Sequence, residues 1–454
     1  MHNLKKLVWA LLIVPVIGFA QVSEYQLDNG LKLLVKPDHR APVVVSQVWY
    51  KVGSSYEHNG ITGISHILEH MMFKGTENLG PNEFSRIIAE NGGSENAFTG
   101  RDYTAYFQTL EKSRLEVSFR LEAERMRKLV IDEAELLKER EVVAEERRMR
   151  TDDNPRALLR EALNASAFMN SPYHHPVIGW MNDINHYAAE DLRDWYQMWY
   201  APNNATVVVV GDVDPDEVYK LAQQYFGPLA PETLATLKPQ IEVEQRGLRT
   251  VQLKAAAELP YLMMGWKVPV VATAEEEWVP YALDVLAGVL DGGASSRFSR
   301  ELVREQQVVA GVSAYNNAFS RLDDIFTIAG TPAQGKTVED VKQAVLDQLE
   351  KVKSTPVTEA ELQRVKTQVI AGSVYELDSV FYQAMQLGML ETIGLDWRLV
   401  DSYPEKIAAI TAEQVQQVAE KYFVEDSLTI AELIPVATEN TSTSRPMSGD
   451  QHVR

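Results

Sequence analysis

The chain has 454 residues, of which 45% are hydrophobic and 24% are charged, so it can form more than one globular domain. Its formal net charge of −20 argues against nucleic acid as a partner, because phosphate binding requires clustered lysine and arginine. The sequence contains no cysteine, which excludes disulfide bonds and thiolate metal sites. Any metal must therefore be held by histidine, aspartate or glutamate.

The N-terminus has the features of an export signal. Lys5 and Lys6 precede an apolar run of 13 residues, Leu7 to Phe19, and Ala20 is a small residue suited to a cleavage site. The run is shorter than the roughly 20 residues that a membrane-spanning helix needs, although an uncleaved anchor is the alternative. We therefore predict a signal peptide over residues 1–20 and a mature protein without stable membrane insertion. Its predicted location is periplasmic or secreted.

The mature chain begins with strand-like segments and then changes to helical spacing. Tyr25 to Val35 is typical of two strands around an Asn-Gly turn, and residues 43–52 predict another strand. Between Gly63 and Phe73 the apolar residues recur at the period of a helix. Further along we predict, in order, a helix over residues 82–90, a strand over 103–110, helices over 112–128 and 132–150, and a strand over 205–210.

The chain consists of two related halves. A helix that begins at Ala189 and a strand that begins at Ala205 recur without a gap 223 residues later, at Ala412 and Leu428. A chance match of two common units is the alternative. Three prolines mark a linker over residues 228–247. We predict an α+β fold in which two homologous lobes, residues 21–227 and 248–435, enclose a cleft. Each lobe is a mainly antiparallel sheet with helices packed on it, and residues 436–454 form a disordered tail.

A short motif on the helix predicted after Gly63 favours a metal site. In His66-Ile67-Leu68-Glu69-His70 the two histidines are four residues apart, so both imidazoles project from one face and can reach one ion. Glu69 lies near the same face but is offset, which suits a group that contacts a water on the metal. Two histidines placed there by chance are the alternative.

The helix predicted over residues 132–150 offers a third ligand. Catalytic zinc typically has three protein ligands and a water. Glu139 and Glu146 are seven residues apart, two helical turns on one face, with Val142 and Val143 between them. A charged, solvated helix is the alternative interpretation, and we accept it for Glu141 and Glu145.

These motifs resemble those of a known family. The chain is similar to the pitrilysin/insulinase metallopeptidases over nearly its whole mature length, in the two-domain branch that includes the mitochondrial processing peptidase. The matching segments are His66 to Thr76, Asn96 to Thr99, Asp102 to Phe107, Glu139 to Glu146 and Trp199 to Asn204.

The resemblance implies one zinc ion per chain, held by His66, His70 and Glu146, with Glu145 as the fallback third ligand. It implies that Glu69 is the general base that activates the zinc-bound water. Glu139 would support the site without being a primary ligand.

The resemblance also implies how a peptide substrate is held. Asn96 and Ala97 match positions that contact the substrate backbone. Residues 103–110 would then be an edge strand to which a peptide adds by β-augmentation.

The second half departs from the pattern of active single-chain relatives, which offer an arginine and, seven residues later, a tyrosine. Arg304 fits the arginine, and a surface ion pair with Glu301 or Glu305 is its alternative role. The tyrosine position is Gly311, and Tyr315 lies four residues later. A missing oxyanion donor typically costs about 100-fold to 1000-fold in rate. We therefore expect a homodimer or heterodimer with a homologous subunit that supplies the missing group, unless Tyr315 substitutes after a loop shift.

Together these observations predict an exported zinc-dependent endopeptidase that hydrolyses peptides or unfolded segments. The alternative is a non-catalytic structural or peptide-binding subunit of the same fold.

Overall fold

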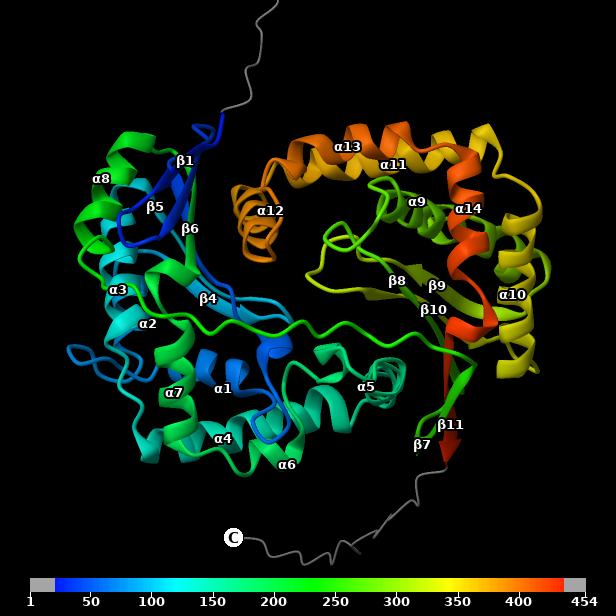
Figure 1. The fold of residues 1–454 in the computed structure, drawn as a ribbon, viewed down its shortest axis with the longest axis horizontal. Helices are drawn as coiled ribbons and strands as arrows, with labels where there is room; N and C mark the ends of the chain where they lie inside the picture. Colours follow the sequence, from blue (N-terminus) through cyan, green and yellow to red (C-terminus); the bar gives the residue numbers. More distant parts are fainter. Residues whose placement is uncertain (1–20, 437–454) are drawn as a thin grey trace, which may run out of the picture.

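The computed structural model describes residues 21–436, which form two sheets with their helices (Figure 1). The predicted signal peptide and residues 437–454 of the predicted tail lie outside the described residues. The first sheet has six strands in the order β1-β2-β6-β3-β5-β4. Its strands are β1 (Ser23–Gln26), β2 (Lys32–Pro37), β3 (Val43–Tyr50), β4 (Ser94–Thr99), β5 (Thr104–Glu111) and β6 (Ala205–Gly211).

The second sheet repeats the topology of the first. Its five strands have the order β7-β11-β8-β10-β9, in which β7 and β11 are parallel and the other neighbours are antiparallel. In the first sheet β2 and β6 are likewise parallel and all other neighbours antiparallel. The strands are β7 (Arg249–Ala256), β8 (Tyr261–Val268), β9 (Val309–Tyr315), β10 (Asp324–Pro332) and β11 (Leu428–Val436). The predicted α+β fold of two homologous, mainly antiparallel lobes is confirmed.

Helices cover one face of each sheet. The first sheet carries α1 (Ile64–Met71), α2 (Glu83–Glu90), α3 (Leu115–Arg127), α4 (Glu133–Arg147), α6 (Met181–Ile184), α7 (Ala189–Trp199) and α8 (Pro215–Tyr225). The second carries α9 (Val279–Asp291), α10 (Val338–Ser354), α11 (Glu359–Glu376), α13 (Leu399–Ala409) and α14 (Ala412–Tyr422). Among residues 21–436, no helix is both long and apolar enough to cross a bilayer.

The opposite face of each sheet is covered by a helix from the other half of the chain. Helix α5 (Pro155–Ala167) packs on β7, β8 and β11 of the second sheet, and α12 (Val380–Thr392) packs on β3 and β6 of the first (Figure 1). Residues of β6 that point away from α1 therefore meet α12, and the whole strand is buried. This explains its continuous run of valines, because a strand buried on both faces does not alternate. The two lobes thus exchange a helix.

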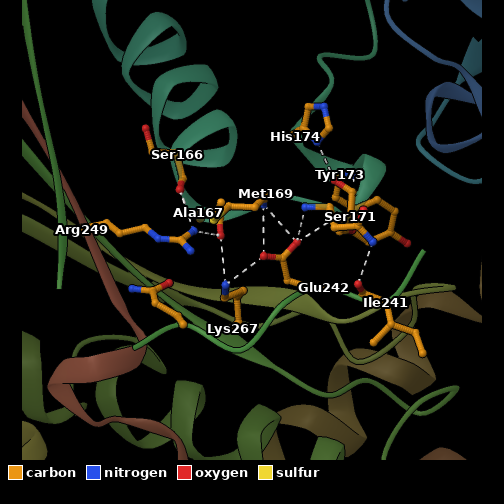
Figure 2. A network of polar contacts seen from close by, with 12 residues as sticks. Ser166, Ala167, Met169, Ser171, Tyr173, His174, Ile241, Glu242, Arg249 and Lys267 are labelled. Atoms are coloured by element: carbon orange, nitrogen blue, oxygen red, sulfur yellow. Dashed lines mark hydrogen bonds and ion pairs between the residues drawn. The ribbon is translucent and has the colours of Figure 1, made fainter. Parts of the chain in front are cut away.

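Two basic side chains of the second lobe hold the C-terminal end of α5 (Figure 2). Arg249 Nη1 donates hydrogen bonds to the carbonyls of Ser166 and Ala167, at 2.9 and 2.7 Å. Lys267 Nζ donates to the Ala167 carbonyl at 3.1 Å. The last carbonyls of a helix have no partner within the helix, so cationic donors there stabilise its end. The second lobe therefore fixes where α5 stops.

The segment predicted as a linker contains no helix or strand, yet it is anchored at Glu242. The Glu242 carboxylate accepts hydrogen bonds from three successive backbone N–H groups, residues 169–171, and pairs with Lys267 at 3.2 Å (Figure 2). Burial would raise the pKa of Glu242, but these bonds outweigh it and the pKa is lowered. The segment between the lobes is therefore held to the loop that follows α5.

The lobes also meet where the β4–β5 turn touches the β9–β10 connection. Arg101 Nη1 lies 2.9 Å from Asp324 Oδ1, and Arg321 Nε lies 3.3 Å from Asp102 Oδ1. The Tyr173 hydroxyl donates to Asp102 at 2.5 Å. Because β4 ends at Thr99, this junction lies directly beyond the end of that strand.

One prediction about the sheet was wrong. The segment predicted as a strand over residues 103–110 is β5, but it lies between β3 and β4 and is not an edge strand. The edge is β4, whose residues are mostly exposed or half-buried. The edge position was implied by the family resemblance, whereas the structure pairs β5 on both sides and packs Phe381 of α12 against its Phe107.

Candidate metal centre

Helix α1 begins at a buried, glycine-dependent turn. Gly63 has φ of 85°, and a Cβ there would lie 2.4 Å from the Ile178 carbonyl oxygen, so only glycine fits. The Glu57 carboxylate accepts hydrogen bonds from the backbone N–H groups of Gly63 and Ser65, at 2.6 and 2.9 Å. Burial raises the pKa of Glu57 to about 7 despite these bonds. Glu57 therefore holds the N-terminal turn of the helix in place.

The two faces of α1 differ in chemistry. Its apolar face is fully buried in the first lobe and consists of Ile64, Ile67, Leu68 and Met71. The other face carries His66, Glu69 and His70 toward α4. The predicted helix is confirmed, and its packing fixes the direction in which the two imidazoles point.

Helix α4 brings Glu146 to both imidazoles. His66 Nε2 lies 3.7 Å from Glu146 Oε1, and His70 Nε2 lies 3.4 Å from Glu146 Oε2. One ligand atom from each of the three residues lies within 4.8 Å of the others, and no other such group occurs among residues 21–436. Ligands at 2.0–2.1 Å from a tetrahedral zinc are about 3.3 Å apart. The three side chains therefore fit one zinc ion after small movements.

The neighbouring Glu145 is placed differently. Its side chain is 65% exposed and pairs with Arg148 on the outside of the helix. It is not part of the group that could hold a metal. The structure thus brings Glu146, and not the fallback Glu145, to the histidines.

Glu139 lies behind His70. Its Oε2 is 3.2 Å from His70 Nδ1, and its Oε1 is 2.7 Å from Lys74 Nζ. A carboxylate at Nδ1 keeps the proton on that nitrogen and leaves the Nε2 lone pair free to bind a metal. Burial would raise the pKa of Glu139, but the bonds with His70 and Lys74 lower it. Glu139 is therefore placed to orient His70 without being a ligand.

The pKa values of the two histidines are shifted in opposite directions. Burial, together with the charge on His70, lowers the pKa of His66 to about 4. Burial would also lower the pKa of His70, but its hydrogen bonds with Glu139 and Glu146 raise it to about 9. The hydrogen bond with His70 in turn lowers the pKa of Glu146. Because metal ligands must be deprotonated, a metal held by His70 Nε2 would displace the proton from that nitrogen.

A residue of β4 holds the side chain of Glu69 by a hydrogen bond. The hydroxyl of Thr99, the last residue of that strand, donates to Glu69 Oε2 at 2.5 Å. Burial raises the pKa of Glu69, although the Thr99 bond and the charge on His70 oppose the rise. A carboxylate with a raised pKa is a better proton acceptor near neutral pH.

Sequence reasoning did not single out four side chains that shape this site. They are Glu57, Lys74, Thr99 and Arg150, the last of which lies 2.5 Å from Glu146 Oε1. Thr99 and Lys74 fall inside motifs that were recognised, but their roles depend on contacts between distant segments. Only the spacing of Arg150, four residues after Glu146 on a helix, could have revealed its ion pair.

Asn96 and Ala97 lie on the edge strand beside this helix. In the register of β4 and β5 they face Phe107 and Tyr106. The Asn96 side-chain oxygen accepts a hydrogen bond from the Ala97 N–H at 2.9 Å. Because β4 is an edge, its outer N–H and C=O groups have no strand partner in the sheet. Both residues are therefore on the strand that can accept an added peptide.

The structure does not bring Arg304 into the group of metal-ligand candidates. Its Nη2 donates to the Ala294 carbonyl at 2.6 Å on the second lobe. Within the described part of the chain it forms no ion pair with Glu301 or Glu305, so the surface-pair interpretation is not borne out. Glu301 pairs with Arg300 and Lys351 instead.

Gly311 and Tyr315 lie on one face of the edge strand β9. Both are exposed, and Tyr315 is paired with Thr327 while Gly311 is paired with Thr331. Four residues along a strand span about 14 Å, so a small loop shift cannot bring the Tyr315 ring to the Gly311 position. A Cβ at Gly311 would meet no atom within 4 Å, which leaves room for a larger side chain.

These observations agree with comparisons to known proteins. Residues 32–179 match the insulinase domain of peptidase family M16, and residues 187–369 match the domain described as the peptidase M16 inactive domain. The chain belongs to the insulinase (M16) peptidase family, as the resemblance to pitrilysin and insulinase predicted.

Its relatives include proteins named as zinc proteases. The zinc protease PqqE of Helicobacter pylori is 33% identical over 415 residues, which cover 90% of this chain and 92% of that protein. The uncharacterized zinc protease YmxG of Bacillus subtilis is 26% identical and covers 89% of this chain and 96% of that protein.

Solved structures agree with the fold. A protease from Helicobacter pylori has a TM-score of 0.85 at 31% identity, over 92% of this chain and all of that one. The periplasmic protease PqqL from Escherichia coli has a TM-score of 0.78 at 19% identity, over 91% of this chain and 48% of that one.

Proposed function

We propose that this chain is an exported zinc-dependent endopeptidase that hydrolyses peptides or unfolded segments. The observation that carries the proposal is the convergence of His66, His70 and Glu146, with Glu69 on the same helix face. Two neutral imidazoles and one carboxylate are the donor set of many catalytic zinc sites. One zinc ion per chain would be held by these three residues.

A bound zinc ion supplies Lewis acidity, which polarises the scissile carbonyl and makes water a stronger nucleophile near neutral pH. Glu69 accepts the proton of the attacking water and passes it to the leaving amine. The Thr99 hydroxyl holds Oε2 of Glu69, which leaves Oε1 for the water. Glu139 holds the His70 ring by its Nδ1. Asn96 and Ala97 present the edge of β4, to which an extended substrate adds as a further strand.

The test compares the zinc-loaded wild type with Glu69→Gln on unstructured peptides, each with and without a chelator. We expect Glu69→Gln to keep about one zinc per chain and to lose 100-fold to 10,000-fold in kcat, roughly the range that general acid–base catalysis contributes. Glu90→Gln, an exposed glutamate on α2, is the matched control and keeps the wild-type rate. Wild-type hydrolysis by Glu69→Gln would remove Glu69 from the chemistry. Binding without hydrolysis by the wild type would favour a non-catalytic peptide-binding or structural subunit.

The predicted signal over residues 1–20 supports a periplasmic or secreted location. The solved relative PqqL is named a periplasmic protease, which is compatible with export. Fractionation of expressing cells and N-terminal sequencing of the mature protein test this. A mature protein that retains Leu7 to Phe19, or remains in the cytoplasm, would contradict it.

We further propose that the chain works with a homologous subunit as a homodimer or heterodimer. The support is Gly311, which has no side chain where active single-chain relatives offer a tyrosine. PqqL is about twice as long as the part that this chain matches, so its single chain has room for a second half. Full activity of the purified monomer would refute the need for a partner.

A further inference from the structure

A cavity lies in the second lobe, away from the metal-ligand candidates. It has a volume of about 330 Å³ and lies between α9, β9, α11 and α13. Its walls include the carboxylates of Asp284 and Asp291 and the apolar side chains of Phe319 and Val369. We call it the α9 pocket. None of the roles described above uses it.

Among the residues that the structure describes, the two carboxylates of the α9 pocket accept hydrogen bonds only from neutral groups. Asp284 accepts hydrogen bonds from Asn316 Nδ2 at 2.7 Å and from the Tyr403 hydroxyl at 3.0 Å. Asp291 accepts one from the Ala314 N–H at 3.3 Å. No lysine or arginine is among the residues that line the pocket. Asp284 and Asp291 are half-buried, and carboxylates that are partly removed from water without a positive partner are costly, so a cationic ligand is favoured there.

Two further observations point to the same ligand charge. Burial raises the pKa of Asp284 to about 6, and only neutral donors, Asn316 and Tyr403, oppose the rise. The Oδ1 atom of Asn316 is buried and has no hydrogen-bond partner within residues 21–436. A cation with several N–H groups could donate to this oxygen and to Asp284 together. Asn316 Oδ1 is therefore an unused hydrogen-bond acceptor on the residue that also contacts the Asp284 carboxylate.

The α9 pocket lies close to the end of the edge strand β4. Tyr315 lines the pocket and is 64% exposed. Asn317 also lines the pocket, and its Nδ2 donates to Asp324 Oδ2 at 3.5 Å, while Asp324 Oδ1 lies 2.9 Å from Arg101 Nη1. Arg101 is in the turn after β4, two residues beyond the Thr99 that holds Glu69. An extended peptide on β4 would thus leave the strand near the pocket.

We propose that the α9 pocket binds a lysine or arginine side chain of the polypeptide substrate and makes a basic residue at one substrate position favourable. The aliphatic stem would pack on Val369 and Phe319, and the charged head would meet Asp284 with Asp291 beside it. The proposal rests on the proposed peptidase function and adds a subsite in the second lobe, across the junction from Glu69.

The test uses peptides of one length in which a single lysine is moved along the sequence or replaced by norleucine. For the zinc-loaded wild type we expect one position at which norleucine lowers kcat/KM about tenfold. For Asp284→Asn the same replacement should change kcat/KM less than twofold. Asp291→Asn should give an intermediate loss. The matched control is Asp347→Asn, which removes an exposed carboxylate from α10 of the same lobe and keeps the tenfold preference.

Peptide binding to zinc-loaded Glu69→Gln separates this proposal from the peptidase function. If the wild type hydrolyses peptides but has no position at which the charge matters, the pocket proposal fails and the peptidase function stands. If hydrolysis is absent, fluorescence anisotropy with the lysine and norleucine peptides decides. A preference that Asp284→Asn abolishes supports the pocket, and equal binding of both peptides overturns it. Thermal melting of Asp284→Asn shows whether a lost preference reflects misfolding.

Discussion

The two lobes share one topology but differ in what their helices offer. In the first lobe α1 packs against α4, and in the second α9 packs against α11, and the two sheets share one strand order apart from the additional β1 of the first. Helices α1 and α4 place His66, His70 and Glu146 together. Helices α9 and α11 instead border a cavity lined by Asp284 and Val369. One architecture thus supports two kinds of site.

The offset between the halves varies along the chain. Helices α7 and α14 begin at positions 223 residues apart, as do β6 and β11 (412 − 189 and 428 − 205), but β3 and β8 begin 218 apart and β5 and β10 begin 220 apart (261 − 43 and 324 − 104). The lobes therefore correspond element by element and not residue by residue. Helix α4 brings a carboxylate to two histidines, whereas α11 brings Val369 to the wall of the α9 pocket. The fold fixes where a helix pair lies, and individual side chains decide its chemistry.

The largest expected effect is loss of the metal from the first lobe. Glu146→Gln removes the charge of the proposed third ligand, and we expect zinc affinity to fall about a thousandfold, beyond the roughly 10-fold to 100-fold that outer hydrogen-bond partners contribute. Competition with a chromogenic chelator measures it. Glu145→Gln changes the adjacent, exposed carboxylate on the same helix and should leave the affinity unchanged. Equal losses in both variants would show that the metal depends on overall charge and not on this ligand.

Local patterns in the sequence predicted much of this contrast. The spacing of His66, Glu69 and His70 requires only one helix, and the apolar residues between them define which face is buried. The two-turn spacing of Glu139 and Glu146 also placed both on one face of α4, but the choice of Glu146 as the expected third ligand came from the family resemblance. The sequence of α7 and β6 recurs in α14 and β11, and this repeat predicted a second lobe with the same fold.

Contacts between distant segments could not be predicted in this way. The exchange of α5 and α12 depends on which sheet face each helix meets, and the sequence of neither helix identifies that sheet. The edge position predicted for β5 came from the family resemblance and was wrong, because β4 pairs on its outer side. Thr99 reaches Glu69 only because β4 lies beside α1, 30 residues away in the sequence. The position of Arg304 likewise depends on the packing of the second lobe.

The exchanged helix can be tested with a pair of glycines from the second half of the chain. On α12, a Cβ at Gly388 would lie 2.1 Å from the Trp49 indole nitrogen of the first lobe. Gly388→Ala should therefore destabilise the protein by about 2 kcal/mol, which for a chain of this length lowers Tm by roughly 2 °C. On α11, a Cβ at Gly372 meets no atom within 4 Å, so Gly372→Ala should keep or slightly raise Tm. Calorimetry measures both. Equal melting of the two variants would mean that α12 is not packed against Trp49 in solution.

The smallest expected effect concerns the edge strand of the second lobe. Gly311→Tyr places a hydroxyl where active relatives have one, and neither sterics nor a left-handed φ opposes the change. If that hydroxyl stabilises the oxyanion, we expect kcat of the lone chain to rise about tenfold, a part of what one such donor typically contributes. Gly311→Phe adds the same ring without the hydroxyl and should leave kcat near the wild-type value. A rise in both variants would point to better packing of the substrate on β9. No rise in either would mean that β9 does not reach the reacting carbonyl from this lobe, so the donor must come from a second subunit.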